Sequence, residues 1–112
     1  MKQASAKQRN IIMSTRKLRR VINEVRGKNA VEAYNILRLM PYKASDVVLK
    51  KLIDAIHNAR IKYNATPEQL VISEVMADGG RTLVRYKPRA QGRVFRREKR
   101  TSHLSLTVSV VE

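Results

Sequence analysis

A run of basic side chains in the last third of the chain carries its most distinctive chemistry. Residues 81–100 contain nine Lys or Arg residues and one acid, Glu98. Because arginine guanidinium groups bind phosphates in bidentate geometry and stack on bases, such a run suits a nucleic acid. Its apolar residues follow no clean period, so it cannot bury a face in a core of its own. The nine bases are Arg81, Arg85, Lys87, Arg89, Arg93, Arg96, Arg97, Lys99 and Arg100.

Turn residues divide the basic run into two halves. Pro88 has no N–H to offer a strand partner, and Gly92 tolerates a positive φ or a close approach to a partner. We therefore expect residues 80–103 to form a long β-hairpin, called the arm below. Two strands of roughly ten residues at about 3.4 Å per residue would reach about 30 Å, comparable with the diameter of a domain of this size.

Two aromatic residues lie near the expected tip of the arm. Tyr86 and Phe95 have few apolar neighbours, so they could stack on unpaired bases. Alternatively, they could pack on each other across the hairpin and stiffen it. The sequence leaves both interpretations open.

The remaining polar residues form no recognisable catalytic or metal-binding motif. His57 and His103 have no HxxxH or HExxH partner and there is no cysteine, so each is better explained as a surface or structurally hydrogen-bonded histidine. Gly79 and Gly80 lack the spacing and the following Lys-Ser/Thr of a phosphate loop, and favour a bulge or bend where the arm leaves the sheet. No serine has a nucleophile-elbow context. We expect no catalytic residue, no metal site and no cofactor.

Charge is distributed unevenly along the 112 residues. The formal net charge is +15, made up of +8 in residues 1–28, zero in 29–80 and +7 in 81–112. Such an excess costs stability through self-repulsion, and a polyanionic partner removes that cost. Nucleic acid is the commonest partner of this kind, and an anionic membrane surface is the next. The length suits one domain, 1–112.

The sequence contains no targeting or membrane signal. No apolar run approaches the length of a membrane span, and residues 1–14 lack the apolar core of a signal peptide. The absence of cysteine fits a reducing compartment.

The first half of the chain predicts a strand and three helices. Residues 2–13 suggest a strand, after which Ser14 can cap a helix that Gly27 ends. A second helix is capped by Asn29, with Glu32 at the capping-box position. A third begins near residues 44–45. The first helix packs through Leu18, Val21, Ile22 and Val25 and presents Arg16, Lys17, Arg19, Arg20 and Arg26 on its opposite face.

The second half predicts strands on both sides of the arm. Residues 70–76 are strand-like, and residues 104–110 alternate apolar and polar side chains with a clean period of two. These two strands can pair and continue outward as the arm. With the N-terminal strand they give an α+β fold, in which three helices cover a three-stranded antiparallel sheet and a long β-hairpin protrudes.

Charge alone does not separate RNA from DNA as the partner. A basic β-arm with a proline near its tip also occurs in minor-groove architectural proteins that bend DNA, which usually act as paired arms in dimers. Here two separate basic elements point to contact with several surfaces at once, which favours a large folded RNA. A nuclease or RNA-modifying enzyme would need clustered acids, a metal site or a cofactor loop.

Several short motifs occur in a specific order. They are Ser14-Thr15-Arg16-Lys17-Leu18-Arg19, Arg26-Gly27, Asp78-Gly79-Gly80, Pro88-Arg89-Ala90-Gln91-Gly92-Arg93 and Lys99-Arg100-Thr101-Ser102-His103. Each is weak alone, but together the chain resembles the family of large ribosomal subunit protein twenty-two, of the bacterial and organellar type, over essentially its whole length. Thr15 stands where the family often has Pro, and Arg60 stands where many members have an acid.

The resemblance implies a structural role in the large ribosomal subunit. Family members bind large-subunit rRNA, contact several of its domains and hold them together during assembly, while the hairpin lines the polypeptide exit tunnel. By matching position, the implied rRNA contacts are Lys7, Arg9, Arg16, Lys17, Arg19, Arg20, Arg81, Arg85, Arg96, Arg97, Lys99 and Arg100. The implied tunnel tip is Tyr86, Lys87, Pro88, Arg89, Ala90, Gln91, Gly92 and Arg93.

The resemblance also implies the partners and the location of the chain. The expected partners are large-subunit rRNA, other large-subunit ribosomal proteins and the nascent polypeptide in the tunnel. We expect no membrane partner and no homo-oligomer. The expected location is the cytoplasm of a bacterium, or the stroma or matrix of an organelle.

Overall fold

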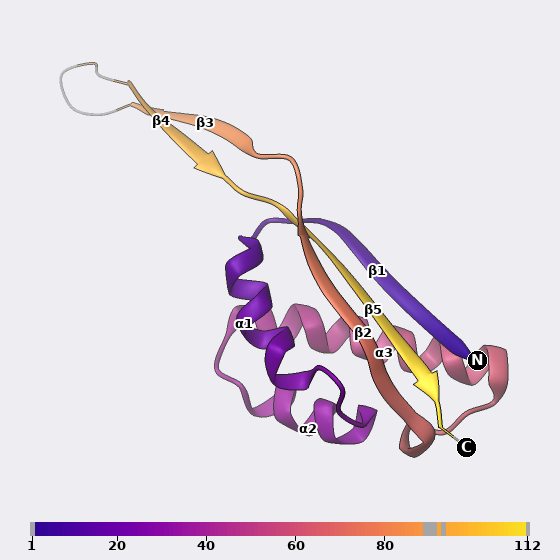
Figure 1. The fold of residues 1–112 in the computed structure, drawn as a ribbon. Coiled ribbons are helices and arrows are strands. Elements are labelled where there is room, and N and C mark those ends of the chain that lie inside the picture. The colour runs from indigo at the N-terminus through magenta and orange to yellow at the C-terminus, as the bar shows by residue number, and fades with distance from the viewer. Residues whose placement is uncertain (1, 89–91, 93, 112) are drawn as a thin grey trace.

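Three helices and a three-stranded antiparallel sheet form the body of the chain, and a two-stranded hairpin extends from it (Figure 1). The structure is a computed structural model that describes residues 2–88, 92 and 94–111. The predicted α+β class is confirmed. In chain order the elements are β1 Gln3–Ile11, α1 Thr15–Val25, α2 Ala30–Leu39, α3 Lys43–Tyr63, the 3₁₀ helix η1 Pro67–Gln69, β2 Leu70–Gly79, β3 Leu83–Pro88, β4 Val94–Lys99 and β5 Ser102–Val110.

Strand β5 is the centre of the body's sheet. The strand order is β1-β5-β2, so β5 pairs antiparallel with β1 on one side and with β2 on the other. Leu104, Leu106 and Val108 are fully buried, whereas Ser105 and Thr107 between them are half-buried. The period-two pattern in the sequence therefore identified both the strand and its buried face.

The ends of the strands differ from the prediction by a few residues. β5 begins at Ser102 rather than at Leu104, because the backbone of Ser102 pairs with Ile11 and with Gly79 whatever its side chain. The N-terminal strand ends at Ile11, short of the predicted end at Met13. There the Met13 N–H donates to the Ile11 carbonyl at 2.8 Å and turns the chain.

The three helices cover one face of this sheet (Figure 1). α1 lies against β2, α3 lies against β1 and β5, and α2 packs mainly on α3. The predicted stripe of α1 is confirmed, because Leu18, Val21, Ile22 and Val25 are all buried in the core. The helix is thereby fixed with its basic face away from the core.

Two helix boundaries illustrate what the sequence could and could not place. Gly27 follows α1 with φ of 78°, the left-handed conformation expected of a helix-ending glycine. α3 begins at Lys43 rather than at Ala44 or Ser45. Ser45 is fully buried inside the first turn, where its hydroxyl donates to the Tyr42 carbonyl, so it is not the cap.

Ser14 and Asn29 occupy the predicted N-cap positions, but only Asn29 makes a capping side-chain bond. Ser14 occupies the N-cap of α1 without a capping side-chain bond. Asn29 caps α2, and its side-chain oxygen accepts from the Val31 N–H at 2.9 Å. Glu32 does not complete a capping box with Asn29. Its carboxylate lies 3.8 Å from the Lys28 ammonium instead, because that cation is one helical turn away.

Two arginine side chains, one from α1 and one from its C-cap residue Arg26, donate to carbonyl groups along the edge strand β2. The Arg19 guanidinium donates to the Ala77 carbonyl at 3.1 Å, and the Arg26 guanidinium donates to the Val75 carbonyl, also at 3.1 Å. The two carbonyls are two residues apart on the strand, so both point the same way. These bonds dock the helix on the sheet and block the edge against pairing with another strand.

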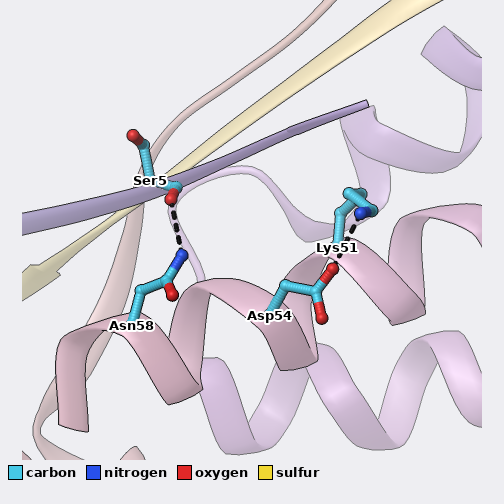
Figure 2. Close-up of polar contacts among 4 residues, drawn as sticks. All are labelled: Ser5, Lys51, Asp54 and Asn58. Atoms are coloured by element: carbon cyan, nitrogen blue, oxygen red, sulfur yellow. Dashed lines mark hydrogen bonds and ion pairs between the residues drawn. The ribbon is translucent and has the colours of Figure 1, made fainter. Parts of the chain in front are cut away.

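The opposite edge strand, β1, is held by α3 in the same manner. The Asn58 amide donates to the Ser5 carbonyl at 3.0 Å (Figure 2). The Tyr63 hydroxyl donates to the Gln3 carbonyl at 3.1 Å. Each edge of the sheet is therefore tied to a different helix, and the body is closed on both sides.

Substitutions of two leucines separate the core from the surface. Leu106 is 0% exposed at the centre of β5, and Leu39 is 82% exposed at the end of α2. We expect Leu106→Ala to lower the free energy of unfolding by about 2–5 kcal/mol, because it removes buried contacts and leaves a cavity. Leu39→Ala should change it by less than about 0.5 kcal/mol. Urea denaturation followed by circular dichroism measures both, and equal losses would contradict this placement of the core.

Candidate nucleic-acid interface

The arm is a paired hairpin that projects from one end of the body (Figure 1). β3 and β4 pair antiparallel from Leu83 opposite Lys99 to Pro88 opposite Val94, in a sheet separate from the body's. The molecule measures 65 × 25 × 17 Å along its principal axes, an elongated shape to which the arm contributes. The predicted continuation of the body's strands into a hairpin is confirmed.

The register of the arm bears on its two aromatic residues. Tyr86 pairs with Arg96, and Lys87 pairs with Phe95, so the two aromatic residues are not opposite one another. The register therefore does not provide the direct cross-strand pair that would stiffen the hairpin. Tyr86 is 69% exposed, which leaves its ring open to a partner.

The foot of the arm, residues 80–82 and 100–103, is fastened by hydrogen bonds between its two sides. The Gly80 N–H donates to the Thr101 carbonyl at 2.8 Å, and the buried Thr101 hydroxyl donates to the Arg81 carbonyl. A Cβ on Gly80 would lie 2.7 Å from the Thr101 hydroxyl oxygen, closer than real Cβ contacts. Of the two alternatives expected here, a bulge or a bend, the bulge is excluded at Gly79, since Gly79 pairs in register with Ser102 and the ladder then ends.

The foot is also tied to the end of β1. The Ser102 hydroxyl, fully buried, donates to the Met13 carbonyl at 2.6 Å. The Asn10 N–H donates to the His103 Nδ1 at 3.2 Å, where Asn10 has φ of 59° and the register of β1 shifts. His103 is thus the hydrogen-bonded structural histidine that the sequence suggested. His57, the other histidine, is exposed on α3.

The two basic residues of β1, Lys7 and Arg9, lie next to this foot. Lys7 and Arg9 are exposed and alternate with the buried Ala4 and Ala6, so they lie on the face turned away from the helices. Together with His103 they line a hollow of about 450 Å³. Fixed positive charge and a hydrogen-bonding imidazole around an open hollow suit a phosphate group.

The predicted bases of α1 form a second surface. Arg16, Lys17, Arg19 and Arg20 are all exposed. Two of them also have partners within the chain, since Arg19 holds β2 and the Arg20 guanidinium lies 4.2 Å from the centroid of the Tyr42 ring. Arg19 therefore has a structural role that the sequence did not reveal, and Arg16 and Lys17 are the more available pair.

The structure describes some of the predicted arm residues and not others. Arg81, Lys99 and Arg100 are exposed near the foot, and Pro88 is exposed at the end of β3. Gly92 has φ of 73°, as a turn glycine would. In the backbone Arg85 and Lys87 lie in β3, and Arg96 and Arg97 lie in β4. The predicted tip residues that fall outside the described part of the chain are Arg89, Ala90, Gln91 and Arg93.

Sequence reasoning missed residues that the tertiary fold brings to the α1 surface. Tyr42 and Lys43, at the start of α3, lie beside Lys17 and Arg20 around a common hollow. Nothing in the spacing links positions more than twenty apart in the chain. The cation–π contact between Arg20 and Tyr42 therefore had no sequence signal.

Two ion pairs lie in or next to the neutral middle of the chain. Lys51 and Asp54 on α3 are 2.7 Å apart (Figure 2), and Lys28 and Glu32 pair at the start of α2. Among the described residues, no group of three or more His, Asp or Glu residues is placed to hold a metal ion. Within the same part of the chain, no helix is both long and apolar enough to cross a membrane.

Comparison with known proteins agrees with this arrangement. The family model described as Ribosomal protein L22p/L17e matches residues 6–109. The chain is 47% identical over 106 residues to the large ribosomal subunit protein uL22 of Clostridium novyi, covering 95% of this chain and 96% of that protein. It is 46% identical over 101 residues to the uL22 protein of Microcystis aeruginosa, covering 90% of this chain and 85% of that protein.

The body, its hairpin and these matches together define a ribosomal protein. The chain belongs to the ribosomal protein L22p/L17e family. The resemblance stated from the motifs at both ends of the chain is thereby confirmed. The uL22 protein of Acaryochloris marina is 44% identical over 106 residues, covering 95% of this chain and 88% of that protein.

The two glycines at the foot provide a matched test of its packing. We expect Gly80→Ala to lower the free energy of unfolding by about 1–3 kcal/mol, because the added methyl collides with the Thr101 hydroxyl. Gly79→Ala meets nothing within 4 Å, so it should be neutral or stabilising by up to about 1 kcal/mol. Urea denaturation of both variants measures this, and amide exchange of residue 80, whose N–H donates to the Thr101 carbonyl, is a local readout. Equal behaviour of the two would show that the foot is not tightly packed.

Proposed function

We propose that the chain is a structural component of the large ribosomal subunit, that it binds large-subunit rRNA through two basic surfaces, and that its arm lines the polypeptide exit tunnel. The observation that carries the proposal is the projecting paired arm, whose foot adjoins the exposed bases of β1. Membership of the family supports the ribosomal part, and the geometry supports the division between a body that anchors and an arm that reaches.

Phosphate neutralisation is the physical basis of the proposed binding. The chain has a net charge of +15, and the excess resides in its first and last segments. RNA phosphates that contact Lys and Arg release condensed counterions, which drives association and makes it dependent on salt. Two basic surfaces on one rigid body can bridge RNA segments that would otherwise repel each other. This role needs no catalytic residue and no cofactor.

The proposal divides the basic residues among three contacts. The body holds RNA through β1 and α1, the stem of the arm follows RNA inward, and the tip meets the tunnel and the nascent polypeptide. The body contacts are Lys7, Arg9, Arg16, Lys17, Arg19 and Arg20; the stem contacts are Arg81, Arg85, Arg96, Arg97, Lys99 and Arg100; the tip is residues 86–93.

Other features of the proposal follow from the ribosomal setting. The chain acts as one domain, its remaining partners are neighbouring large-subunit proteins, and it forms no homo-oligomer. It resides with ribosomes in the cytoplasm of a bacterium, or in the stroma or matrix of an organelle.

Removing charge from α1 should weaken RNA binding in a salt-dependent way. We expect the double variant Arg16→Gln/Lys17→Gln to bind large-subunit rRNA less tightly, with the slope of log affinity against log salt reduced by about one per lost phosphate contact. Fluorescence anisotropy with labelled rRNA fragments over a range of salt concentrations measures both quantities.

A charge-matched variant controls for net charge. Lys50→Gln/Lys62→Gln removes two exposed cations from α3 and should leave the salt slope unchanged. Equal effects of the two variants would mean that binding follows total charge and not this surface. Competition at fixed salt completes the test, because a preference for duplex DNA over large-subunit rRNA would favour a DNA-bending protein instead.

Shortening the arm should remove the contacts made at its far end without unfolding the body. A variant lacking residues 83–94 should keep the body's circular dichroism and cooperative unfolding, because the described residues of that segment are absent from the buried core. It should lose the crosslinks to tunnel rRNA and to nascent chains that photoreactive groups at positions 86–93 form in the full chain. Co-sedimentation with large subunits followed by crosslink mapping reads this out. Unfolding of the shortened chain would contradict the division into arm and body.

A further inference from the structure

An open hollow between the end of β1, the first turn of α1 and the start of α3 combines apolar and basic side chains. Its volume is about 320 Å³. Its apolar part includes Ile12, which is 62% exposed, and Tyr42, which is 38% exposed. Exposed large apolar residues grouped in one concavity often mark a binding surface. The residues that matter for its chemistry are Ile12, Met13, Lys17, Arg20, Tyr42 and Lys43.

Tyr42 is already arranged as a stacking platform. The Arg20 guanidinium lies 4.2 Å from the centroid of its ring, a cation–π geometry. Aromatic rings and guanidinium planes are the two surfaces on which proteins stack unpaired bases. A pair that is already in contact loses less side-chain entropy when a third planar group joins it than two separate side chains would.

The positive charge around the hollow favours an anionic ligand. Lys17, Arg20 and Lys43 contribute three cations, and among the described residues no acid lines the hollow. By contrast, the apolar hollow between α2 and α3 is lined by Glu68 and, within the described part of the chain, by no Lys or Arg. The basic hollow is therefore distinguished from an ordinary apolar groove by its complementarity to phosphate.

The hollow is rigidly connected to the foot of the arm. Met13 lines it, and the Met13 carbonyl accepts the bond from the buried Ser102 hydroxyl. A ligand bound here would therefore be held at a fixed position relative to the arm.

We propose that this hollow binds one unpaired nucleotide of an RNA, with its base stacked on Tyr42 against Ile12 and its phosphate held by Lys17 and Lys43. The inference rests on the proposed RNA-binding function and adds to it a site that distinguishes unpaired nucleotides from paired ones. Base stacking of this type distinguishes an extruded nucleotide from a paired one, which phosphate contacts alone do not.

The test compares two RNA hairpins that differ by one residue, using the full chain. One hairpin carries a single bulged 2-aminopurine, and the other is fully paired. We expect the bulged RNA to bind more tightly and its fluorescence to change on binding. Tyr42→Ala should reduce affinity for the bulged hairpin by about 5- to 150-fold, the range for loss of one base stack. It should leave affinity for the paired hairpin nearly unchanged.

A matched pair of isoleucines provides the control. Ile12→Ala should reduce the preference for the bulged RNA, whereas Ile61→Ala removes an equally large, exposed side chain from α3 outside this hollow and should not. Thermal unfolding of each variant checks that it folds. If Tyr42→Ala fails to fold, two other variants carry the test: Tyr42→Leu, which removes the ring but keeps apolar bulk, and Ile12→Ala, which keeps the ring of Tyr42.

Binding to large-subunit rRNA, measured in parallel, separates the possible outcomes. If the chain binds this rRNA but does not discriminate between the hairpins, or if the Tyr42 and Ile12 variants discriminate like the unaltered chain, the nucleotide site is wrong and the proposed function stands. If the chain binds neither rRNA nor hairpin, the proposed function itself is overturned.

Discussion

The hydrogen bonds at the foot of the arm are the constraint on which the rest of the structure depends. Ser102 is fully buried, and an unpaired hydroxyl there would cost about 1–3 kcal/mol, so its bond to the Met13 carbonyl fixes where β1 ends. The Thr101 hydroxyl does the same for the opposite side of the arm through Arg81. The direction of the arm is thus set by the body and not by the arm's own composition, which could not form a core.

Because β5 is the central strand, the hydrogen bonds at the foot constrain the whole sheet of the body. β5 follows directly from the foot and pairs with both other strands of the body. A displacement of the foot would disturb the register of the whole sheet, and a one-residue slip would turn the buried face of β5 outward. Helices α1 and α3, each bonded to an edge strand, oppose such a slip from either side. The arm is therefore the free end of a body that is fixed at its core and at both edges.

Much of this fold was predictable because its signals are periodic. The alternation in residues 104–110 and the helical stripe of α1 depend only on neighbours along the chain, so the sequence shows them directly. The start of β5 at Ser102 was not predictable in that way, because its backbone pairing needs no apolar side chain. Neither was the Arg19 bond to Ala77, since it forms only after helix and sheet have met.

The candidate site was predictable to a similar extent. Composition identified basic residues at both ends of the chain, because charge excess requires no knowledge of the fold. Composition could not show that Tyr42 meets Arg20, or that Lys7 and Arg9 face the same hollow as His103. These groupings depend on tertiary contacts between distant segments. The approach of α3 to α1 brings an aromatic ring to a basic surface, a grouping that counting charges cannot reveal.

The form of the arm follows from the conflict between reach and charge. A strand rises about 3.3 Å per residue against about 1.5 Å for a helix, so a hairpin gives the greater reach for its length. A two-stranded ribbon is marginal alone, and here like charges lie along both strands. The hydrogen bonds at the foot fix the starting register of the ribbon, but they leave the repulsion between its strands uncompensated. The buried core therefore stabilises the body, whereas the arm has no core of its own to offset its charge.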